Sequence, residues 1–133
     1  MEGGHPSPID AMDISVIKAL TFDVLGTVVA HRDSLIRAGR EFGRAKGIEV
    51  DWEKLVDRWR EHQGRTLDEE RKAGTGWTKS FVLYRRSLEH VLAEFGITRL
   101  SPAEIDEFNR TWERLDPWPD SVAGLTRMKK KFI

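Results

Sequence analysis

Asp23 is the residue whose surroundings best fit nucleophilic chemistry. It follows residues 16–22, a short apolar run that is typical of a buried strand. Gly26 and Thr27 come soon after it, so a tight backbone path and a hydroxyl group lie near the carboxylate. Open α/β sheets place their chemistry at the carboxyl ends of strands, where a carboxylate can carry a covalent intermediate. An ordinary turn also fits these residues, because aspartate is common in turns.

Arg60 and Trp77 are the other residues whose positions suggest contact with a ligand. Arg60 follows Trp59 on a predicted helix and lies about 100° around it, so Trp59 can pack inward while Arg60 faces a cleft. A solvated arginine is the commoner arrangement. Trp77 lies in a break between two predicted helices and is therefore the better pocket candidate. Tryptophans on apolar helix faces are expected in the core, namely Trp52, Trp59 and Trp112.

The histidines do not predict a metal site. His31 follows the aspartate loop, His62 and His90 lie on predicted helices, and His5 lies near the start of the chain. No two of them have the spacing of metal ligands. Cysteine is absent, which excludes disulfides, thiolate metal sites and a cysteine nucleophile. This absence fits a reducing cytoplasm, where we expect the protein to be.

Helices account for most of the remaining sequence. Apolar residues repeat at helical spacing, with capping residues or glycines at the ends, over residues 34–46, 51–64, 78–96 and 101–115. The clearest start is at Ser101, because Pro102 fits the first helical position and Glu104 completes a capping box. Residues 122–128 predict one more short helix, and residues 132–133 look like the opening of a second strand.

These elements predict an α/β chain in which a helical block is inserted between the first strand and the next. We expect a disordered tail over residues 1–15, a first strand and nucleophile loop over 16–32, a helical cap over 33–115 and a return to the core over 116–133. The second strand would only begin at residue 132, so the expected product is truncated and mostly helical. A parallel strand is normally paired along its edges. We therefore also expect a poorly organised nucleophile loop.

Charge and hydropathy exclude two classes of partner. The chain has 22 basic and 22 acidic side chains among 133 residues, whereas a nucleic-acid-binding surface needs a basic excess. No apolar run approaches the roughly 20 residues of a membrane span. We therefore expect neither a nucleic acid nor a membrane as partner.

Three segments together resemble one enzyme group. Residues 19–28, with the sequence ALTFDVLGTV, resemble the first motif of the haloacid dehalogenase superfamily. Residues 51–61 and 115–121 are similar to the cap and the cap exit of the type II 2-haloacid dehalogenases. The similarity extends over residues 16–133. The resemblance implies a Rossmann-like core, represented by its first strand and motif loop, with an inserted helical cap.

The resemblance also implies a mechanism. Asp23 would attack the halogen-bearing carbon of an L-2-haloacid and displace halide, and water would hydrolyse the aspartyl ester. Thr27 matches the threonine that supports the nucleophile, and Arg60 matches a cap arginine that faces the substrate and the departing halide. Val24 and Leu25 would bind the substrate beside the backbone amides of the loop. Trp77 is the further substrate-binding candidate.

Leu25 separates the alternatives within the superfamily. Phosphatases of the superfamily usually have an aspartate two positions after the nucleophile, where this sequence has Leu25. Such a group protonates a leaving alkoxide, whereas halide leaves without a proton. Leu25 therefore favours dehalogenation over a phosphatase-like hydrolase. The sequence predicts no metal or other cofactor, and magnesium enters only with the phosphatase alternative. A non-catalytic helical fragment is the third interpretation.

The expected partner is a small molecule, a 2-haloacid. The superfamily's dehalogenases often dimerise through the helical block, and the sequence leaves a homodimer open. The sequence does not identify the natural substrate.

Overall fold

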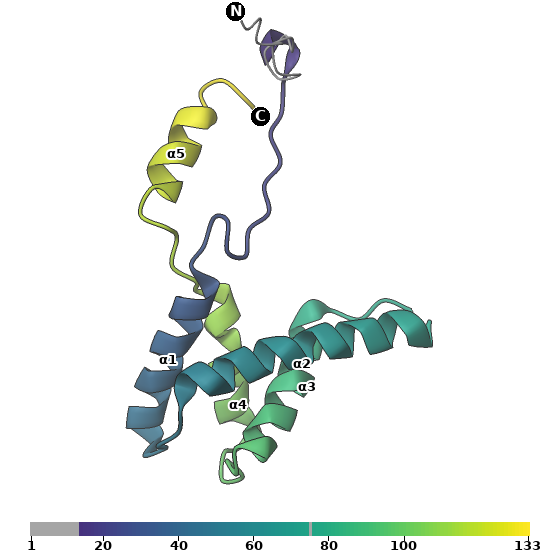
Figure 1. The fold of residues 1–133 in the computed structure, drawn as a ribbon, viewed down its shortest axis with the longest axis vertical. Helices are drawn as coiled ribbons and strands as arrows, with labels where there is room; N and C mark the ends of the chain where they lie inside the picture. Colours follow the sequence, from purple (N-terminus) through teal and green to yellow (C-terminus); the bar gives the residue numbers. More distant parts are fainter. Residues whose placement is uncertain (1–13, 75) are drawn as a thin grey trace, which may run out of the picture.

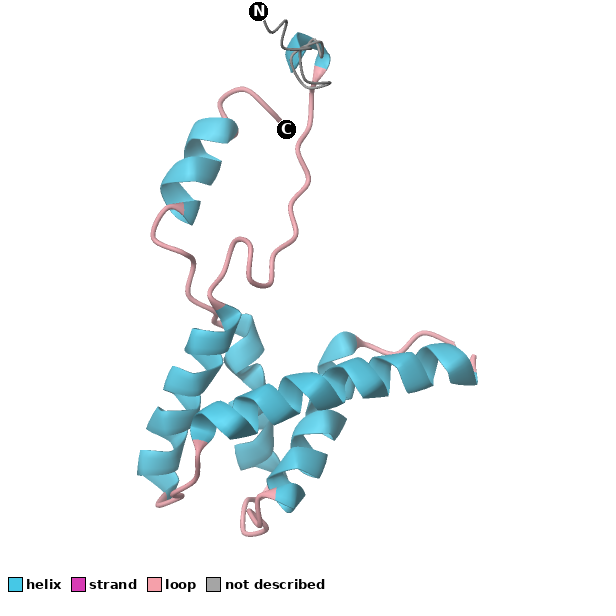
Figure 2. Ribbon diagram, in the orientation of Figure 1, coloured by secondary structure: helices cyan, strands magenta, loops and turns pink. Residues whose placement is uncertain are grey.

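The computed structural model describes residues 14–74 and 76–133, and it is built almost entirely of helices and loops (Figures 1 and 2). The first thirteen residues of the predicted tail lie outside the described part of the chain. Five α-helices follow one another, namely α1 (His31–Lys46), α2 (Trp52–Ala73), α3 (Ser80–Glu94), α4 (Pro102–Asn109) and α5 (Ser121–Met128). Helices α1 to α4 form one body, and α5 lies apart from it beside the segment that precedes α1 (Figure 1).

Phe108 on α4 lies at the centre of the helical body. Its ring stacks on Phe42 of α1 at 5.1 Å between centroids, and it meets Trp52 at 5.7 Å and Trp59 at 5.5 Å. Trp59 is fully buried, and its indole N–H donates to the backbone carbonyl of Tyr84 on α3 at 2.9 Å. Aromatic side chains bury large areas and prefer such stacked and edge-on contacts. This cluster joins all four helices.

The predicted helix ends are largely confirmed. Asp51 accepts a hydrogen bond from the backbone N–H of Lys54 at 3.1 Å and caps α2. Ser101 and Glu104 form the capping box that starts α4. Gly47 ends α1 with a left-handed φ of 63°, which a residue without a Cβ adopts at little cost.

Helix α2 does not end at Gly64, as the sequence analysis predicted, but continues to Ala73. A glycine inside a helix costs only about 1 kcal/mol relative to alanine, and contacts with α3 outweigh this cost. Glu70 pairs with Arg86 of α3 at 2.6 Å, and Ser87 donates to the Thr66 hydroxyl at 3.1 Å. Tertiary packing therefore extends the helix past its weak point.

The strand predicted over residues 16–22 is not formed among the described residues. Val16 ends a short 3-10 turn, and residues 17–24 have no regular secondary structure. The backbone N–H of Ile133 donates to Lys18 at 2.9 Å, and that of Leu20 donates to Ile133 at 3.4 Å. These two bonds flank Ala19 in the pattern of a parallel pair. The end of the chain thus lies beside residues 18–20, but one residue pair does not make a sheet.

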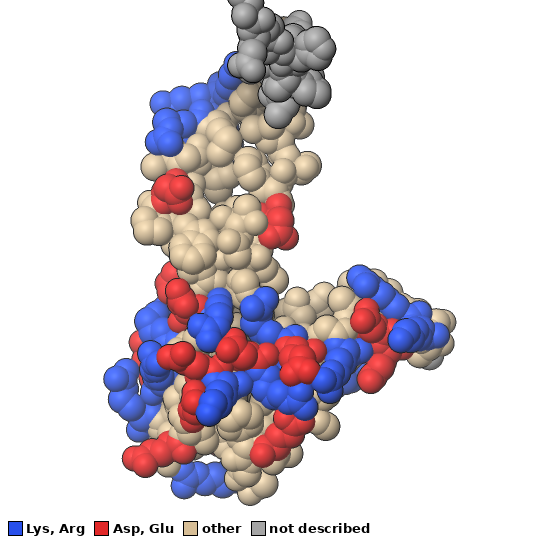
Figure 3. Space-filling view, viewed as in Figure 1, with Lys and Arg blue, Asp and Glu red and all other residues tan. Residues whose placement is uncertain are grey.

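Charged residues of both signs alternate over the visible face of α1 and α2 (Figure 3). They form ion pairs such as Arg32–Asp57 at 2.8 Å and Arg40–Glu53 at 2.7 Å. No surface of a single sign is seen over these two helices (Figure 3). Among the described residues no helix is long and apolar enough to cross a membrane.

Two glycines inside helices provide a matched test of this packing. A Cβ on Gly39 would lie 2.5 Å from the Trp52 ring, whereas a Cβ on Gly64 meets no atom within 4 Å. We expect Gly39→Ala to lower the free energy of unfolding by about 1–3 kcal/mol through overpacking. Gly64→Ala should raise it by about 0.5–1 kcal/mol. Urea unfolding followed by circular dichroism measures both, and equal effects of the two changes would contradict the packing.

Candidate active site

The loop that carries Asp23 closes on itself through backbone hydrogen bonds. Gly26 donates to the carbonyl of Val29 at 2.9 Å, and the amides of Val28 and Val29 donate to Val24 at 3.0 and 3.1 Å. Gly26 has a φ of +92°, which strains any residue with a Cβ. The motif therefore requires a glycine at position 26, because the loop turns there with a positive φ.

Thr27 and Asp23 are brought together by this turn. The Thr27 hydroxyl donates to Oδ2 of Asp23 at 3.0 Å. Both side chains are exposed. The second carboxylate oxygen of Asp23 makes no hydrogen bond that involves the described residues. An oriented carboxylate with one accessible oxygen has the geometry of a nucleophile.

The loop also accepts hydrogen bonds from residues 116–121, which we call the return segment. The backbone N–H of Trp118 and the hydroxyl of Ser121 donate to the carbonyl of Val28 at 3.1 and 2.7 Å. The indole N–H of Trp118 donates to the carbonyl of Gly26 at 3.1 Å. The expectation of a poorly organised loop is therefore wrong, because these bonds replace the missing sheet contacts.

Asp116 fixes the return segment to the start of α1. The backbone N–H of Ala30 donates to the carbonyl of Asp116 at 2.8 Å. The hydroxyl of Ser34 accepts from the backbone N–H of Asp116 at 2.9 Å. Arg37 donates to the Asp116 carboxylate at 2.6 Å. This ion pair with Arg37, helped by Ser34, holds the pKa of Asp116 below its usual range.

A pocket of about 220 Å³ lies between the loop and the helical body. Leu25 of the loop and Arg60 of α2 both line it. The structure thus brings together two predicted site residues that are 35 positions apart, on the nucleophile loop and on the cap. The other lining residues come from α1, α2, α3 and the segment after α4, and they are His31, Gln63, Gly64, Leu67, Ser80, Leu83, Tyr84 and Trp112.

His31 is a lining residue whose role the sequence analysis missed. It is the first residue of α1 and is only 8% exposed. Burial lowers its pKa, and the positive charge of Arg60 lowers it further, while Asp23 and Asp33 act in the opposite direction. His31 therefore lies within electrostatic reach of both the nucleophile and the cap arginine. Its place directly after the motif loop was visible in the sequence, but its burial was not.

Solved structures similar to this chain are L-2-haloacid dehalogenases. A defluorinating L-2-haloacid dehalogenase is 36% identical over 88% of this chain and 49% of its own, with a TM-score of 0.83. Another L-2-haloacid dehalogenase is 35% identical over 87% of this chain and 49% of its own, with a TM-score of 0.77. The chain belongs to the haloacid dehalogenase superfamily. The resemblance stated from the sequence is confirmed.

A more distant match agrees on the fold. The L-2-haloacid dehalogenase from Xanthobacter autotrophicus is 24% identical over 83% of this chain and 42% of its own, with a TM-score of 0.68. The predicted fold class, a haloacid dehalogenase fold with an inserted helical cap, is confirmed by these matches. The chain spans about half the length of the solved dehalogenases that it matches. No protein-family model and no curated protein matches it.

Two predicted substrate-binding residues lie outside the pocket. Val24 is 52% exposed on the loop, and Trp77 is 83% exposed between α2 and α3. Neither lines the pocket that holds Leu25 and Arg60. The roles of all six predicted site residues stay predictions, as do the boundaries of the domains.

Helices α2 and α3 bring together two histidines for which the sequence predicted no relation. The rings of His62 on α2 and His90 on α3 are 3.9 Å apart between centroids, and Glu94 lies 3.1 Å from His90. Their ligand atoms lie within 4.8 Å of one another. Glu94 already accepts two hydrogen bonds from Arg58, at 2.7 and 2.9 Å. Glu94 is therefore already paired with Arg58 and His90, whereas His62 meets the cluster through its ring contact with His90.

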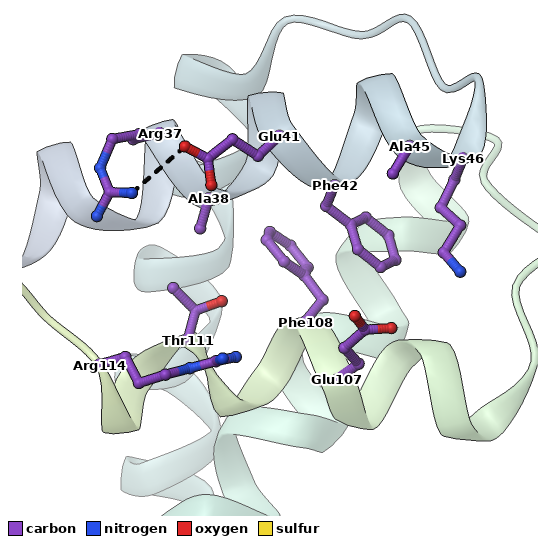
Figure 4. A pocket seen from close by; sticks show the side chains of 10 residues that line it. All are labelled: Arg37, Ala38, Glu41, Phe42, Ala45, Lys46, Glu107, Phe108, Thr111 and Arg114. Carbon is purple, nitrogen blue, oxygen red and sulfur yellow. Dashed lines mark hydrogen bonds and ion pairs between the residues drawn. The ribbon is translucent and has the colours of Figure 1, made fainter.

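A second groove, of about 430 Å³, lies between α1 and α4 (Figure 4). Phe42 and Phe108 form its apolar floor, and Arg37 and Glu41 form an ion pair at its edge. None of the predicted site residues lines it. The candidate active site is therefore the pocket beneath the nucleophile loop.

The pairing of Asp116 with Arg37 predicts a pH dependence. Because the pKa of Asp116 is lowered by folding, its contribution to stability is present above the ordinary aspartate pKa of about 4 and is lost as the pH falls further. We expect Asp116→Asn to destabilise the chain at pH 7 and to make little difference at pH 2 to 3. Urea unfolding at several pH values measures this.

Asp68→Asn is the matched control, because Asp68 is exposed on α2 and its ion pair with Arg71 spans 3.7 Å. It should have little effect at any pH. A destabilisation by Asp116→Asn that is the same at pH 7 and at pH 2 to 3 would contradict the role of the ion pair.

Proposed function

We propose that this chain acts in the hydrolysis of the carbon–halogen bond of L-2-haloacids, with Asp23 as the nucleophile. The observation that carries the proposal is the Thr27–Asp23 hydrogen bond on a loop that shares a pocket with Arg60. The similarity to L-2-haloacid dehalogenases supports the substrate class. Because the chain spans about half of those proteins, the activity is proposed for the site to which these residues contribute.

The proposed reaction has two displacements. An Asp23 carboxylate oxygen attacks C2 of the substrate from the side opposite the halogen, and the halide leaves with the electrons of the carbon–halogen bond. Water then adds to the carbonyl carbon of the aspartyl ester, which releases the 2-hydroxyacid and a proton and restores Asp23. Thr27 orients the attacking carboxylate by donating to its other oxygen. Arg60 places a positive charge where the halide leaves.

Leu25 supports halide over phosphate as the leaving group. It lines the pocket at the position where a phosphatase of the superfamily would have its acid and base. A hydrocarbon side chain cannot protonate an alkoxide, whereas halide needs no proton. The dehalogenation therefore calls on no metal ion, and magnesium belongs only to the phosphatase alternative. A 2-haloacid is the proposed partner, and a homodimer stays a prediction.

Isotope labelling tests the nucleophile directly. The chain is incubated with L-2-chloropropionate in water enriched in ¹⁸O, and the peptide that contains Asp23 is analysed by mass spectrometry. We expect ¹⁸O in the Asp23 carboxylate, because water attacks the ester at its carbonyl carbon. Asp23→Asn should release no chloride. Chloride release without label at Asp23 would contradict the ester mechanism.

Arg60 has a matched control on the same helix. We expect Arg60→Gln to lower chloride release by about 100-fold, the usual effect of removing one group that stabilises developing charge. Arg65→Gln should leave the rate unchanged, because Arg65 is exposed, pairs with Glu61 and does not line the pocket. Phosphate release from a phosphomonoester with magnesium, without chloride release, would favour the phosphatase alternative. The absence of both chloride release and phosphate release would favour the helical-fragment interpretation.

A further inference from the structure

Three side chains that can ligate a metal ion lie together between α2 and α3, which pack side by side (Figure 1). They are His62 of α2 and His90 and Glu94 of α3, and their ligand atoms all lie within 4.8 Å of one another. Nε2 of His90 is 3.1 Å from Oε1 of Glu94. Two ligands of a tetrahedral zinc ion are about 3.3 Å apart, because each lies about 2.0–2.1 Å from the metal. A small closing movement of these side chains therefore gives the spacing of a zinc site.

Helix packing holds this group in place. His90 and Glu94 are four residues apart on α3, so their side chains are neighbours on one face of that helix. The ring of His62 approaches from α2, with 3.9 Å between its centroid and that of His90. About one turn away on both helices, the Ser87 hydroxyl donates to the Thr66 hydroxyl at 3.1 Å. The two helices thus present ligands from separate elements that are fixed relative to each other.

The ring of His62 has a nitrogen that the described part of the chain leaves without a partner. Its Nδ1 is buried and makes no hydrogen bond there. Buried polar atoms of native proteins are nearly always paired. Burial lowers the pKa of His62, and the adjacent His90 lowers it further. A neutral imidazole is the form that binds a metal ion, so His62 has the protonation state of a ligand at pH 7.

A surface hollow of about 470 Å³ gives access to both histidines. Its other lining residues are Thr66, Glu69, Glu70, Ala73 and Arg86. An ion in this hollow can complete its coordination with water, as zinc does where the protein supplies three ligands. Neither histidine lines the pocket that holds Leu25 and Arg60. The group is therefore separate from the candidate active site.

Glu94 is shared between this group and Arg58. Arg58 donates to both oxygens of Glu94, at 2.7 and 2.9 Å, and also to Glu61 at 2.6 Å. A carboxylate has about four lone-pair sites, so Glu94 can bind a cation while it keeps a bond to Arg58. Arg58 also keeps Glu61 as a partner when Glu94 turns to the metal. Arg58 therefore weakens metal binding at this site without preventing it.

We propose that His62, His90 and Glu94 bind one divalent transition-metal ion, with Zn²⁺ as the best-fitting candidate and water in the remaining position. Two imidazoles and one carboxylate suit zinc, whereas Mg²⁺ and Ca²⁺ prefer sites made of oxygen ligands. The bound ion cross-links α2 to α3 and stabilises the helical body. This inference goes beyond the proposed function, because the ion joins two helices and takes no part in the reaction.

Calorimetric titration of the tag-free chain at pH 7 tests the site. We expect one Zn²⁺ to bind per chain when zinc chloride is added, and no binding of Mg²⁺ from magnesium chloride. His62→Gln and His90→Gln should each weaken zinc binding by at least about tenfold. Glu89→Gln is the matched control, because Glu89 lies on α3 outside the group and pairs with Arg85 at 2.8 Å. Full zinc affinity in both histidine variants, or no zinc binding by the unaltered chain, would overturn the proposal.

Arg58→Gln gives a change of the opposite sign. It removes the cation that competes for Glu94, so zinc affinity should rise by about tenfold, the effect of one hydrogen bond between charged groups. Glu94→Gln should lower zinc affinity, because a neutral amide is a weaker ligand than a carboxylate. An unchanged affinity in both of these variants would exclude Glu94 as a ligand and overturn the site as proposed.

Measurements on the unaltered chain decide the matter if a variant does not fold. In NMR spectra the ring signals of His62 and His90 should shift with one equivalent of zinc, while those of His31, which lines the other pocket, should not. At a zinc concentration of roughly 100 times the dissociation constant, Tm should rise by about 10 °C. Zinc-dependent shifts at His31 without shifts at His62 and His90 would overturn the proposal.

Discussion

The junction at Asp116 is the constraint on which the candidate site depends. There the chain returns from the helical body, and the backbone N–H of Asp116 donates to the hydroxyl of Ser34, which lies 82 residues earlier in the sequence. The carbonyl of Asp116 accepts from Ala30, and its carboxylate accepts from Arg37. Because both ends of the helical body meet here, the nucleophile loop keeps one position relative to the body. Without this junction, Asp23 and Arg60 would belong to two independently moving segments.

The aromatic core of the helical body sets the opposite wall of the site. Phe108 of α4 packs against Phe42 of α1 and Trp59 of α2. Trp59 meets Trp112 edge-on at 5.7 Å. The ring of His31 in turn stacks on the indole of Trp112. Packing contacts thus extend from the centre of the body to the lining of the pocket. Core and site are therefore coupled here, because the same indole ring packs on Trp59 and lines the pocket.

Local patterns predicted much of this structure, and contacts distant in sequence account for what they missed. The capping residues Asp51 and Ser101 marked two helix starts, and the motif around Asp23 indicated the nucleophile loop and the superfamily. The predicted end of α2 at Gly64 was wrong, because packing against α3 overrides the low helix propensity of glycine. The strand over residues 16–22 needed a paired neighbour that one residue pair does not provide. His31 was missed as a site residue because burial by Trp112 cannot be read from local sequence.

The central claim is that the return segment holds the nucleophile loop, and amide hydrogen exchange tests it most directly. The amides of Ala30 and Trp118 bridge the two segments, donating to Asp116 and Val28. We expect both amides to be protected and Ser34→Ala to lower their protection together, while amides within α2 keep theirs. Exchange of both amides at the rates of an unfolded peptide in the unaltered chain would contradict the account.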